Sequence, residues 1–510
     1  MTGRFEGGGR LADAQEEVLA QLLGLATQLA TAASQDNVPV AMRLEVLGRF
    51  DEQAQTSIGN ALRRHAGGLI EVEIPDDPVL GPLTALLRDA YPLMLVPADR
   101  TFFPRLHLST ALWSSPHRRT LEAAILSDSD LLRLFVTETE SGGWTSIVYR
   151  STGSGGTLQL WSLPDLLLTA AWWSAQLTSA HAQEALAAEL ARLVDVLRRV
   201  ARGEVCKVRA VLAFTGIVLD GVEAVDLPFG TLRPVREHER DLAPPSLEGM
   251  VSHTTPEGRS ITASYAGDVV LETEVDYRIA VEEPDPDGLG EWPAGMRDSE
   301  RLEADLDTVR LASLLVGDGS AMLTLAPTWR MVFDPLSWGP LQSWSDPRTG
   351  PSIAPRRLGA PAVEELAEWV RAIHDNRTPS VDVAVRRVIS ASASRADPVD
   401  ALVDLVIAWE NLFGSRQGEP TLRISAALGW LLGSTPDERE KYRSQASKAY
   451  ALRSDIVHGN RPVSAQEAAE MLAEARTMTF AALRRLFSGR TALLAMKNGD
   501  ERSRALIMDV

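Results

Sequence analysis

The pattern of apolar and polar positions is clearest between residues 361 and 487, where apolar side chains recur every three or four residues, as along one face of a helix. Four helices are predicted there, because residues that begin or end helices separate the apolar segments. They run from Pro398 to Phe413, from Pro420 to Gly433, from Thr435 to Gly459, and from Ser464 to Phe487. Four helices on short connections favour an up-and-down bundle.

The predicted boundaries of these helices rest on local chemistry. Thr435-Pro436-Asp437-Glu438 and Ser464-Ala465-Gln466-Glu467 each place a hydroxyl three residues before a glutamate, which is the sequence of a capping box. Pro420 suits the first turn of the second helix, where a missing N–H costs little. Gly433 and Gly459 follow the second and third helices, and glycine readily takes the conformation that ends a helix.

Residues 1–203 give a mixed and mostly helical pattern. Long helices are predicted over residues 11–33 and 163–200, and Gly203 ends the second. Alternation before Pro75 predicts a strand over residues 69–74. Two further runs, 131–137 and 144–149, predict a hairpin around Ser141-Gly142-Gly143.

Residues 204–334 change to β-branched runs interrupted by Gly, Asp and Pro, which predicts a β-rich domain. Its runs cover residues 205–214, 217–225, 261–280 and 311–333. Residues 335–360 contain five prolines and three glycines and are predicted to be a linker. The expected fold is therefore α+β and multidomain, with a mixed N-terminal region, a β-rich middle domain and an all-α C-terminal domain at residues 361–510.

Composition narrows the class of protein. Cys206 is the one cysteine, so an intrachain disulfide and a cysteine zinc cluster are excluded, and a reducing cytoplasm is expected. No apolar run is long enough for a membrane span. The net charge of −18 argues against a general nucleic-acid coat protein. That charge lies in residues 1–360, with 31 basic against 49 acidic residues, whereas residues 361–510 carry 20 of each and sum to zero.

The third predicted helix ends in the candidate chemistry. An arginine and a histidine separated by four to six residues occur three times, at Arg100–His107, Arg233–His238 and Arg453–His458. Chance alone explains such a count, so the spacing by itself carries little information. The first two matches contain a proline and lie in irregular or strand-like segments. Only Arg453 and His458 lie at a strongly signalled helix end.

Arginine and histidine together can cleave RNA without a metal. The histidine can move a proton near neutral pH, and the arginine can neutralise a phosphorane-like transition state. The structural alternative for His458 is a residue that hydrogen-bonds the last carbonyls of its helix. For Arg453, on one stripe with Tyr442, Ala446 and Ala449, and for Glu410, the alternative is a buried ion pair. Glu410 is expected to pair with Arg453 or with Arg423.

Three blocks in this region resemble the HEPN superfamily, specifically its Apea-like group. They are Ile407-Ala408-Trp409-Glu410-Asn411-Leu412-Phe413, Glu419-Pro420-Thr421-Leu422-Arg423-Ile424, and the run from Tyr450 to Gly459. The resemblance covers about the last 150 residues. It implies a four-helix bundle that dimerises, and a metal-independent endoribonuclease in which Arg453 and His458 are catalytic. Ser454 would help orient the site, and Tyr450 would pack or stack on a base.

The resemblance also implies a setting. Apea-like HEPN proteins are similar to anti-phage, abortive-infection effectors that cleave RNA such as tRNA or mRNA when triggered, without a cofactor. The N-terminal region would then sense a phage-derived trigger. Two alternatives stay open: a non-catalytic HEPN dimerisation or sensor module, and the toxin of a toxin–antitoxin pair. A small antitoxin gene next to this one would favour the pair.

Two other features are noted without an assigned role. The twelve tryptophans, notably Trp172-Trp173, Trp338 and Trp344, are more typical of packing than of a ligand cage. Arg118-Arg119 beside His117 can bind phosphate, but such exposed pairs are usually solvated.

Overall fold

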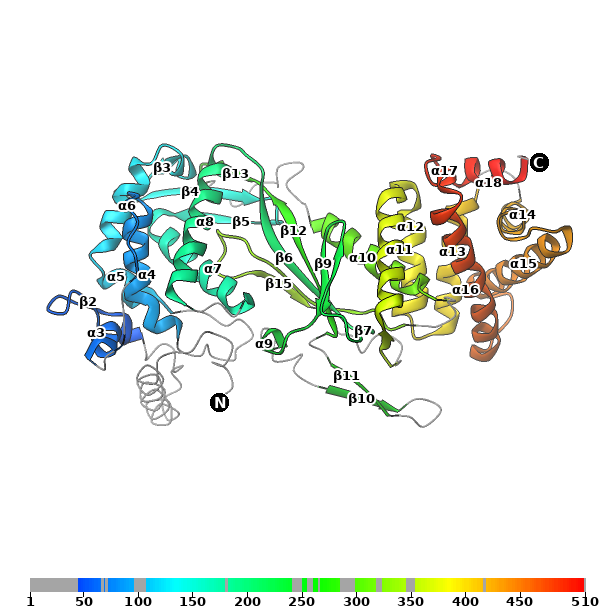
Figure 1. The fold of residues 1–510 in the computed structure, drawn as a ribbon. Helices are drawn as coiled ribbons and strands as arrows, with labels where there is room; N and C mark the ends of the chain where they lie inside the picture. Colours follow the sequence, from blue (N-terminus) through cyan, green and yellow to red (C-terminus); the bar gives the residue numbers. More distant parts are fainter. Residues whose placement is uncertain are drawn as a thin grey trace.

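The computed structural model is an elongated α+β molecule, with helices at both ends and β-sheets between them (Figure 1). It describes residues 45–65, 68, 72–95, 107–178, 182–240, 250–254, 260–264, 267–284, 299–317, 323–344, 354–415 and 419–508. The helix predicted over residues 11–33 and the first half of the strand predicted over 69–74 lie outside these ranges. In the part of the chain that the structure describes, no helix is long and apolar enough to cross a membrane.

Helices form the N-terminal end of the molecule. They are α3 (Ile58–His65), α4 (Leu80–Met94), α5 (Ser109–Ser114), α6 (His117–Ser127), α7 (Leu163–Thr178) and α8 (Gln183–Ala201), with short turns η2 (Glu45–Gly48), η3 (Leu131–Leu134) and η4 (Leu160–Ser162). A small hairpin, β1 (Phe50–Asp51) and β2 (Thr56–Ser57), precedes α3. The single helix predicted over residues 163–200 is therefore two helices, α7 and α8. Residues 72–74, predicted as part of a strand, form none.

A four-stranded sheet lies against these helices. Its strands are β3 (Thr137–Glu138), β4 (Trp144–Arg150), β5 (Ser154–Gln159) and β13 (Ile279–Glu282). The predicted hairpin is confirmed where β3 pairs with β4, although residues 131–134 form a short 3₁₀ turn. β13 comes from the middle of the chain and pairs with β4 through Ile279 and Arg150, so the N-terminal and middle segments share this sheet.

The central sheet has six strands in the order β15-β14-β6-β12-β9-β8. These are β6 (Cys206–Phe214), β8 (Val225–Leu227), β9 (Gly230–Pro234), β12 (Val269–Tyr277), β14 (Pro327–Val332) and β15 (Leu341–Trp344). Two separate pairs are β10 (Met250–Thr254) with β11 (Ser260–Ser264), and β7 (Ile217–Leu219) with β16 (Arg356–Leu358). The predicted linker thus contains β15 and β16.

One predicted strand run is wrong at its start. Residues 311–315 belong to α10 (Ser299–Leu315), and only β14 follows as a strand. The sequence Leu311-Ala312-Ser313-Leu314-Leu315 is a short apolar run, and such a run does not by itself distinguish a buried strand from a buried helix.

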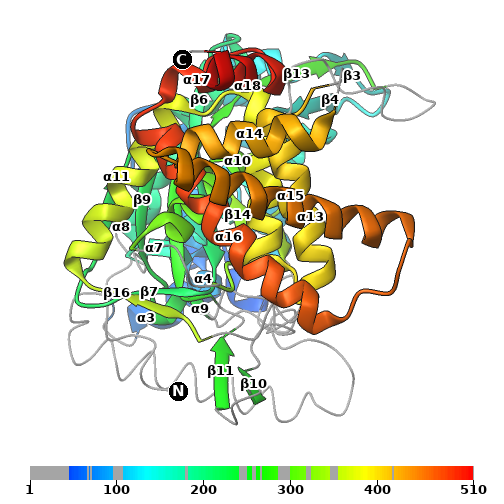
Figure 2. The ribbon, with the colours of Figure 1, turned by 90° about the vertical axis from the view of Figure 1, so that its right-hand side faces the viewer.

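The C-terminal region is helical, and all four predicted helices are present, each within one residue of its predicted bounds. They are α13 (Pro398–Phe413), α14 (Pro420–Leu432), α15 (Pro436–His458) and α16 (Ala465–Ser488). Flanking them are α11 (Ala360–Asn376), η7 (Pro379–Val381), α12 (Asp382–Ile389), the π-turn η8 (Ser390–Ser394), α17 (Thr491–Leu494) and α18 (Gly499–Met508). The short helix α9 (Glu237–Arg240) belongs to the middle segment and packs on α7. Figure 2 shows α14 and α15 side by side and steeply inclined to α16, so the four helices are not a simple row.

One hydrophobic core runs through the whole molecule, from Val79 near the N-terminal end to Leu506 in α18. α10 packs on both β12 and α11, and so joins the central sheet to the C-terminal helices. Arg484 of α16 reinforces this joint, because it donates hydrogen bonds to the carbonyl oxygens of Leu315 and Gly317 at the end of α10.

Candidate functional site

The end of α15 is fixed by backbone geometry. Gly459 follows the helix with φ of 63°, a left-handed conformation that glycine adopts without strain. Its N–H and the N–H of Asn460 both bond the carbonyl oxygen of Asp455, so the last turn is closed by backbone alone. At the other end, Thr435 and Glu438 form both hydrogen bonds of the predicted capping box. The helix therefore places His458 as its last residue.

Arg453 lies on the inward side of α15, as its phase predicts. Ala446 and Ala449 on the same stripe are buried, and so is the neighbouring Leu452. The side chain of Arg453 is only 19% exposed. A guanidinium held this close to the core requires acceptors, because a buried charge without them is costly.

Glu410 of α13 supplies the acceptor. Its Oε2 lies 3.5 Å from Nη2 of Arg453, and its Oε1 accepts a hydrogen bond of 2.9 Å from the hydroxyl of Tyr450. Of the two partners expected for Glu410, the structure has Arg453. Arg423 instead pairs with Asp500 of α18.

The contact between Arg453 and Glu410 leaves the guanidinium incompletely bonded. A distance of 3.5 Å is at the outer limit of a hydrogen bond, and Nε of Arg453 is buried with no partner among the described residues. A guanidinium carries five N–H donors. Arg453 therefore keeps N–H groups that can donate hydrogen bonds to an anionic ligand.

Tyr450 packs beside this pair. Cζ of Arg453 lies 5.9 Å from the centre of its ring, and the phenol is half-buried. Burial, and then the hydrogen bond to Glu410, raise the pKa of Tyr450 above its usual value. The hydroxyl therefore stays protonated near neutral pH and holds the carboxylate of Glu410 in place.

His458 is exposed, and Ser454 is partly exposed on the turn next to Arg453. Neither side chain makes a hydrogen bond to another described residue, so His458 does not bond the helix carbonyls, as its structural alternative would require. Five residues along a helix correspond to about 140° of rotation and roughly 7.5 Å of rise. Arg453 and His458 of one chain thus point in different directions from α15.

Arg461 is a further residue of this region that the sequence did not single out. It lies in the loop after His458 and pairs with Asp455 of α15 at 2.9 Å and with Glu467 of α16 at 2.6 Å. Glu467 was predicted to complete a capping box. Its N–H does bond Ser464, but its carboxylate holds Arg461 instead. The loop that follows His458 is thereby braced between α15 and α16.

The arginines of the other two arginine–histidine matches do not lie at a helix end of this kind in the described structure. Arg100 lies outside the described residues. Arg233 is buried in the central sheet and paired with Glu239 and Glu272. In the part of the chain that the structure describes, no group of three or more His, Cys, Asp or Glu side chains could hold a metal ion.

Comparisons of the chain with protein-family models, with curated proteins and with solved structures found no match in any of the three. The likeness to HEPN proteins thus rests on the three sequence blocks around Glu410, Pro420 and Arg453.

Proposed function

We propose that the protein is a metal-independent endoribonuclease of the HEPN type, with its site at the end of α15. The observation that carries the proposal is the incompletely bonded guanidinium of Arg453, held by Glu410, on the same helix end as the exposed His458. An arginine with open donors suits a phosphate, and an exposed histidine suits proton transfer.

In the proposed reaction, His458 takes the proton of an RNA 2′-hydroxyl, and that oxygen attacks the adjacent phosphorus. Arg453 stabilises the added negative charge on the phosphoryl oxygens. The bond from phosphorus to the 5′-oxygen breaks, and an acid protonates the leaving oxygen. The products are a 2′,3′-cyclic phosphate and a 5′-hydroxyl.

The reaction needs a base and an acid, whereas one chain offers one histidine at this site. Arg453 and His458 of one chain also point in different directions from α15, so a second chain is needed to bring an arginine and a histidine together. A two-fold dimer through the C-terminal helices would bring two copies of each residue to one cleft and would supply both proton-transfer groups.

Glu410 and Tyr450 act in this scheme as positioning residues. Glu410 holds Arg453 from one side, and Tyr450 holds Glu410 through its hydroxyl. Ser454, partly exposed next to Arg453, is placed to orient a bound phosphate. The region before residue 361 would then restrain or trigger the nuclease, as in an anti-phage, abortive-infection effector.

The test is cleavage of total tRNA and of mRNA in EDTA by the wild-type protein and by His458→Ala, with mapping of the product ends. Cyclic phosphate and 5′-hydroxyl ends made only by the wild type would support the proposal. His374→Ala is a matched control, because His374 is also exposed in the last turn of a helix, α11. Cleavage that survives in His458→Ala would refute the role of His458.

The rival function is a non-catalytic dimerisation or sensor module. It is favoured by the ion pair that Arg453 already makes within its own chain. A dimer that cleaves no RNA, even with phage extract added, would support this rival. A toxin of a toxin–antitoxin pair would share the chemistry, and a small neighbouring gene whose product blocks cleavage would identify it.

A further inference from the structure

Asp455 is a carboxylate that helix geometry places beside His458. It stands three residues before the histidine on α15, and residues three apart are neighbours on the surface of a helix. In the described structure the two side chains nevertheless make no ion pair. Oδ2 of Asp455 instead accepts a hydrogen bond of 2.9 Å from Nε of Arg461, and Oδ1 accepts one of 3.3 Å from the side-chain amide of Asn460. The loop after the helix thus draws the carboxylate away from the histidine.

Arg461 uses most of its hydrogen-bond donors on two carboxylates. While Nε bonds Asp455, Nη1 and Nη2 donate to the two oxygens of Glu467 on α16, at 3.0 and 2.6 Å. A fork of this kind fixes the plane of the guanidinium as well as its distance. The bonds to Glu467 and Asp455 raise the pKa of Arg461, and the bond from Arg461 lowers the pKa of Glu467. Both groups therefore keep their charges over the pH range in which a histidine titrates.

The two carboxylates that Arg461 holds have different alternatives. Glu467 lies three residues after Ser464, so without the arginine it can accept a hydrogen bond from the N–H of Ser464 and complete a capping box within α16. Asp455 has no second charged partner in its own turn. Asn460 is uncharged, and the cation that Asp455 can reach one helical turn away is a protonated His458.

Carboxylates on the elements packed against α15 have partners of their own. α14 contains no acidic residue, and no described carboxylate makes an ion pair with His458. The partners are Arg453 for Glu410 of α13, Arg395 for Asp400 and Asp404 of α13, and Gln466 and Gln445 for Glu470 and Glu474 of α16. Removal of Arg461 therefore changes the surroundings of His458 mainly through Asp455.

From this arrangement we infer that Arg461 is a positioning residue that withholds Asp455 from His458 and so keeps the imidazole free to take a proton. The inference rests on the proposed function, in which His458 is the base. A histidine beside an unpaired carboxylate holds its proton more tightly, so it acts as a base only at a higher pH. Arg461 acts through Asp455, without a contact of its own to the imidazole.

The experiment is an NMR titration of the histidine ring signals in the full-length protein, with the His458 signal identified by its absence in His458→Ala. In Arg461→Ala the pH midpoint of this signal should rise by roughly 0.3 unit, the size of one ion pair between adjacent helix turns. In Arg461→Ala/Asp455→Asn it should return to the wild-type midpoint, because an amide carries no charge. Arg461→Lys keeps a cation beside Asp455 and should stay close to the wild type.

Two single variants serve as controls. Arg443→Ala is matched to Arg461→Ala, because Arg443 also lies at the surface, 42% against 45% exposed, and forms a two-bond fork with Glu440 on α15. It should leave the midpoint of His458 unchanged. Asp455→Asn alone should also leave it unchanged, since Arg461 already neutralises that carboxylate. An unchanged midpoint in Arg461→Ala would overturn the inference, as would a rise that persists in the double variant or a fall in Asp455→Asn alone.

The titration does not depend on cleavage, so the inference and the nuclease activity can fail separately. If the wild type cleaves RNA, the pH of half-maximal rate should move upward in Arg461→Ala and return in Arg461→Ala/Asp455→Asn, together with the NMR midpoint. A slower rate with an unchanged pH profile would show that Arg461 only braces the loop. If the wild type cleaves no RNA, the NMR midpoints still decide whether Arg461 withholds Asp455 from the histidine.

Discussion

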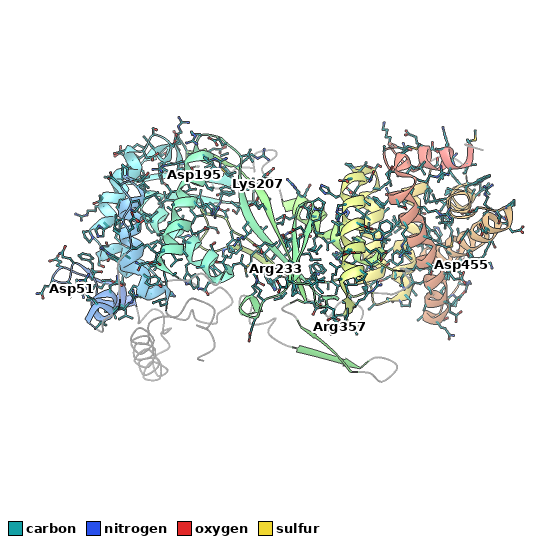
Figure 3. All side chains as sticks on the ribbon, viewed as in Figure 1. Asp51, Asp195, Lys207, Arg233, Arg357 and Asp455 are labelled. Carbon is teal, nitrogen blue, oxygen red and sulfur yellow. The ribbon has the colours of Figure 1, made fainter. Side chains whose placement is uncertain are left out.

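Arg233 and Arg453 stand in the same sequence pattern, an arginine five residues before a histidine, and their surroundings are opposite. Arg233 lies in the central sheet with its side chain 5% exposed, and Glu239 beside it is fully buried. Arg453 lies near the end of α15, 19% exposed, with Glu410 31% exposed. Figure 3 shows Arg233 in the middle of the molecule and Asp455, two residues beyond Arg453, toward the far end.

The hydrogen bonds of the two arginines differ accordingly. Arg233 donates to both oxygens of Glu239, and its Nε donates to Glu272 at 3.1 Å. Burial opposes the charge of Arg233, and its bonds to Glu239 more than offset this, so the pKa of Arg233 is raised. Arg453 has one long contact and a buried Nε without a described partner. Arg233 thus uses its hydrogen-bond donors within the fold, whereas Arg453 keeps donors with which it can bind a ligand.

The largest effect is expected from breaking the buried pair. Glu239→Gln leaves the charge of Arg233 buried beside a weaker acceptor. We expect the free energy of unfolding to fall by roughly 3–5 kcal/mol. The measurement is the urea midpoint of unfolding followed by circular dichroism. A urea midpoint equal to that of the wild type would show that the ion pair between Arg233 and Glu239 does not stabilise the fold.

Arg453→Ala is expected to affect cleavage rather than folding. Removing the group that stabilises the transition-state charge should reduce the rate about 100- to 1000-fold, with the urea midpoint nearly unchanged. Single-turnover cleavage of labelled RNA in EDTA gives the rate. Arg233→Ala is the opposite case, and loss of cleavage there should follow the loss of folded protein. If Arg453→Ala unfolds the protein as readily as Arg233→Ala does, the contrast between the two arginines fails.

Arg476 of α16 sharpens the comparison from a third position. It is 6% exposed, and its Nε and Nη2 have no partner in the described ranges. Burial lowers the pKa of Arg476 to about 10. The charge of Arg476 is buried and its Nε and Nη2 lack acceptors. Arg476→Met should therefore stabilise the protein, raising the free energy of unfolding by about 1–3 kcal/mol. An increase in the urea midpoint checks this, and a decrease would reveal a partner that stabilises the charge.

Glu410→Gln should have the smallest effect on stability. The pair with Arg453 is partly exposed and long, so its removal should cost less than about 1 kcal/mol. Cleavage should nevertheless fall several-fold, because Arg453 is less well positioned. Tyr450→Phe removes the hydrogen bond to Glu410 and should likewise have a small effect on stability and reduce cleavage several-fold. A loss of stability as large as that of Glu239→Gln would show that Glu410 has a mainly structural role.

The helices of the C-terminal region could be predicted because their signals are local. Thr435 and Glu438, Pro420, and Gly459 fix helix ends through bonds within a few residues. The phase of α15 similarly predicted that Arg453 faces inward. The run from residue 311 was misassigned, since a short apolar segment fits either a buried strand or a buried helix.

By itself, the sequence determined where α13 to α16 begin and end, and that Arg453 lies on a buried stripe, because these follow from hydrogen bonds and periodicity within one helix. Only the tertiary structure decided that Glu410 meets Arg453 while Arg423 meets Asp500. It also showed which carboxylates each of Arg233 and Arg453 meets. Contacts of this kind join residues distant in the chain, and they depend on how whole elements pack, which no local pattern specifies.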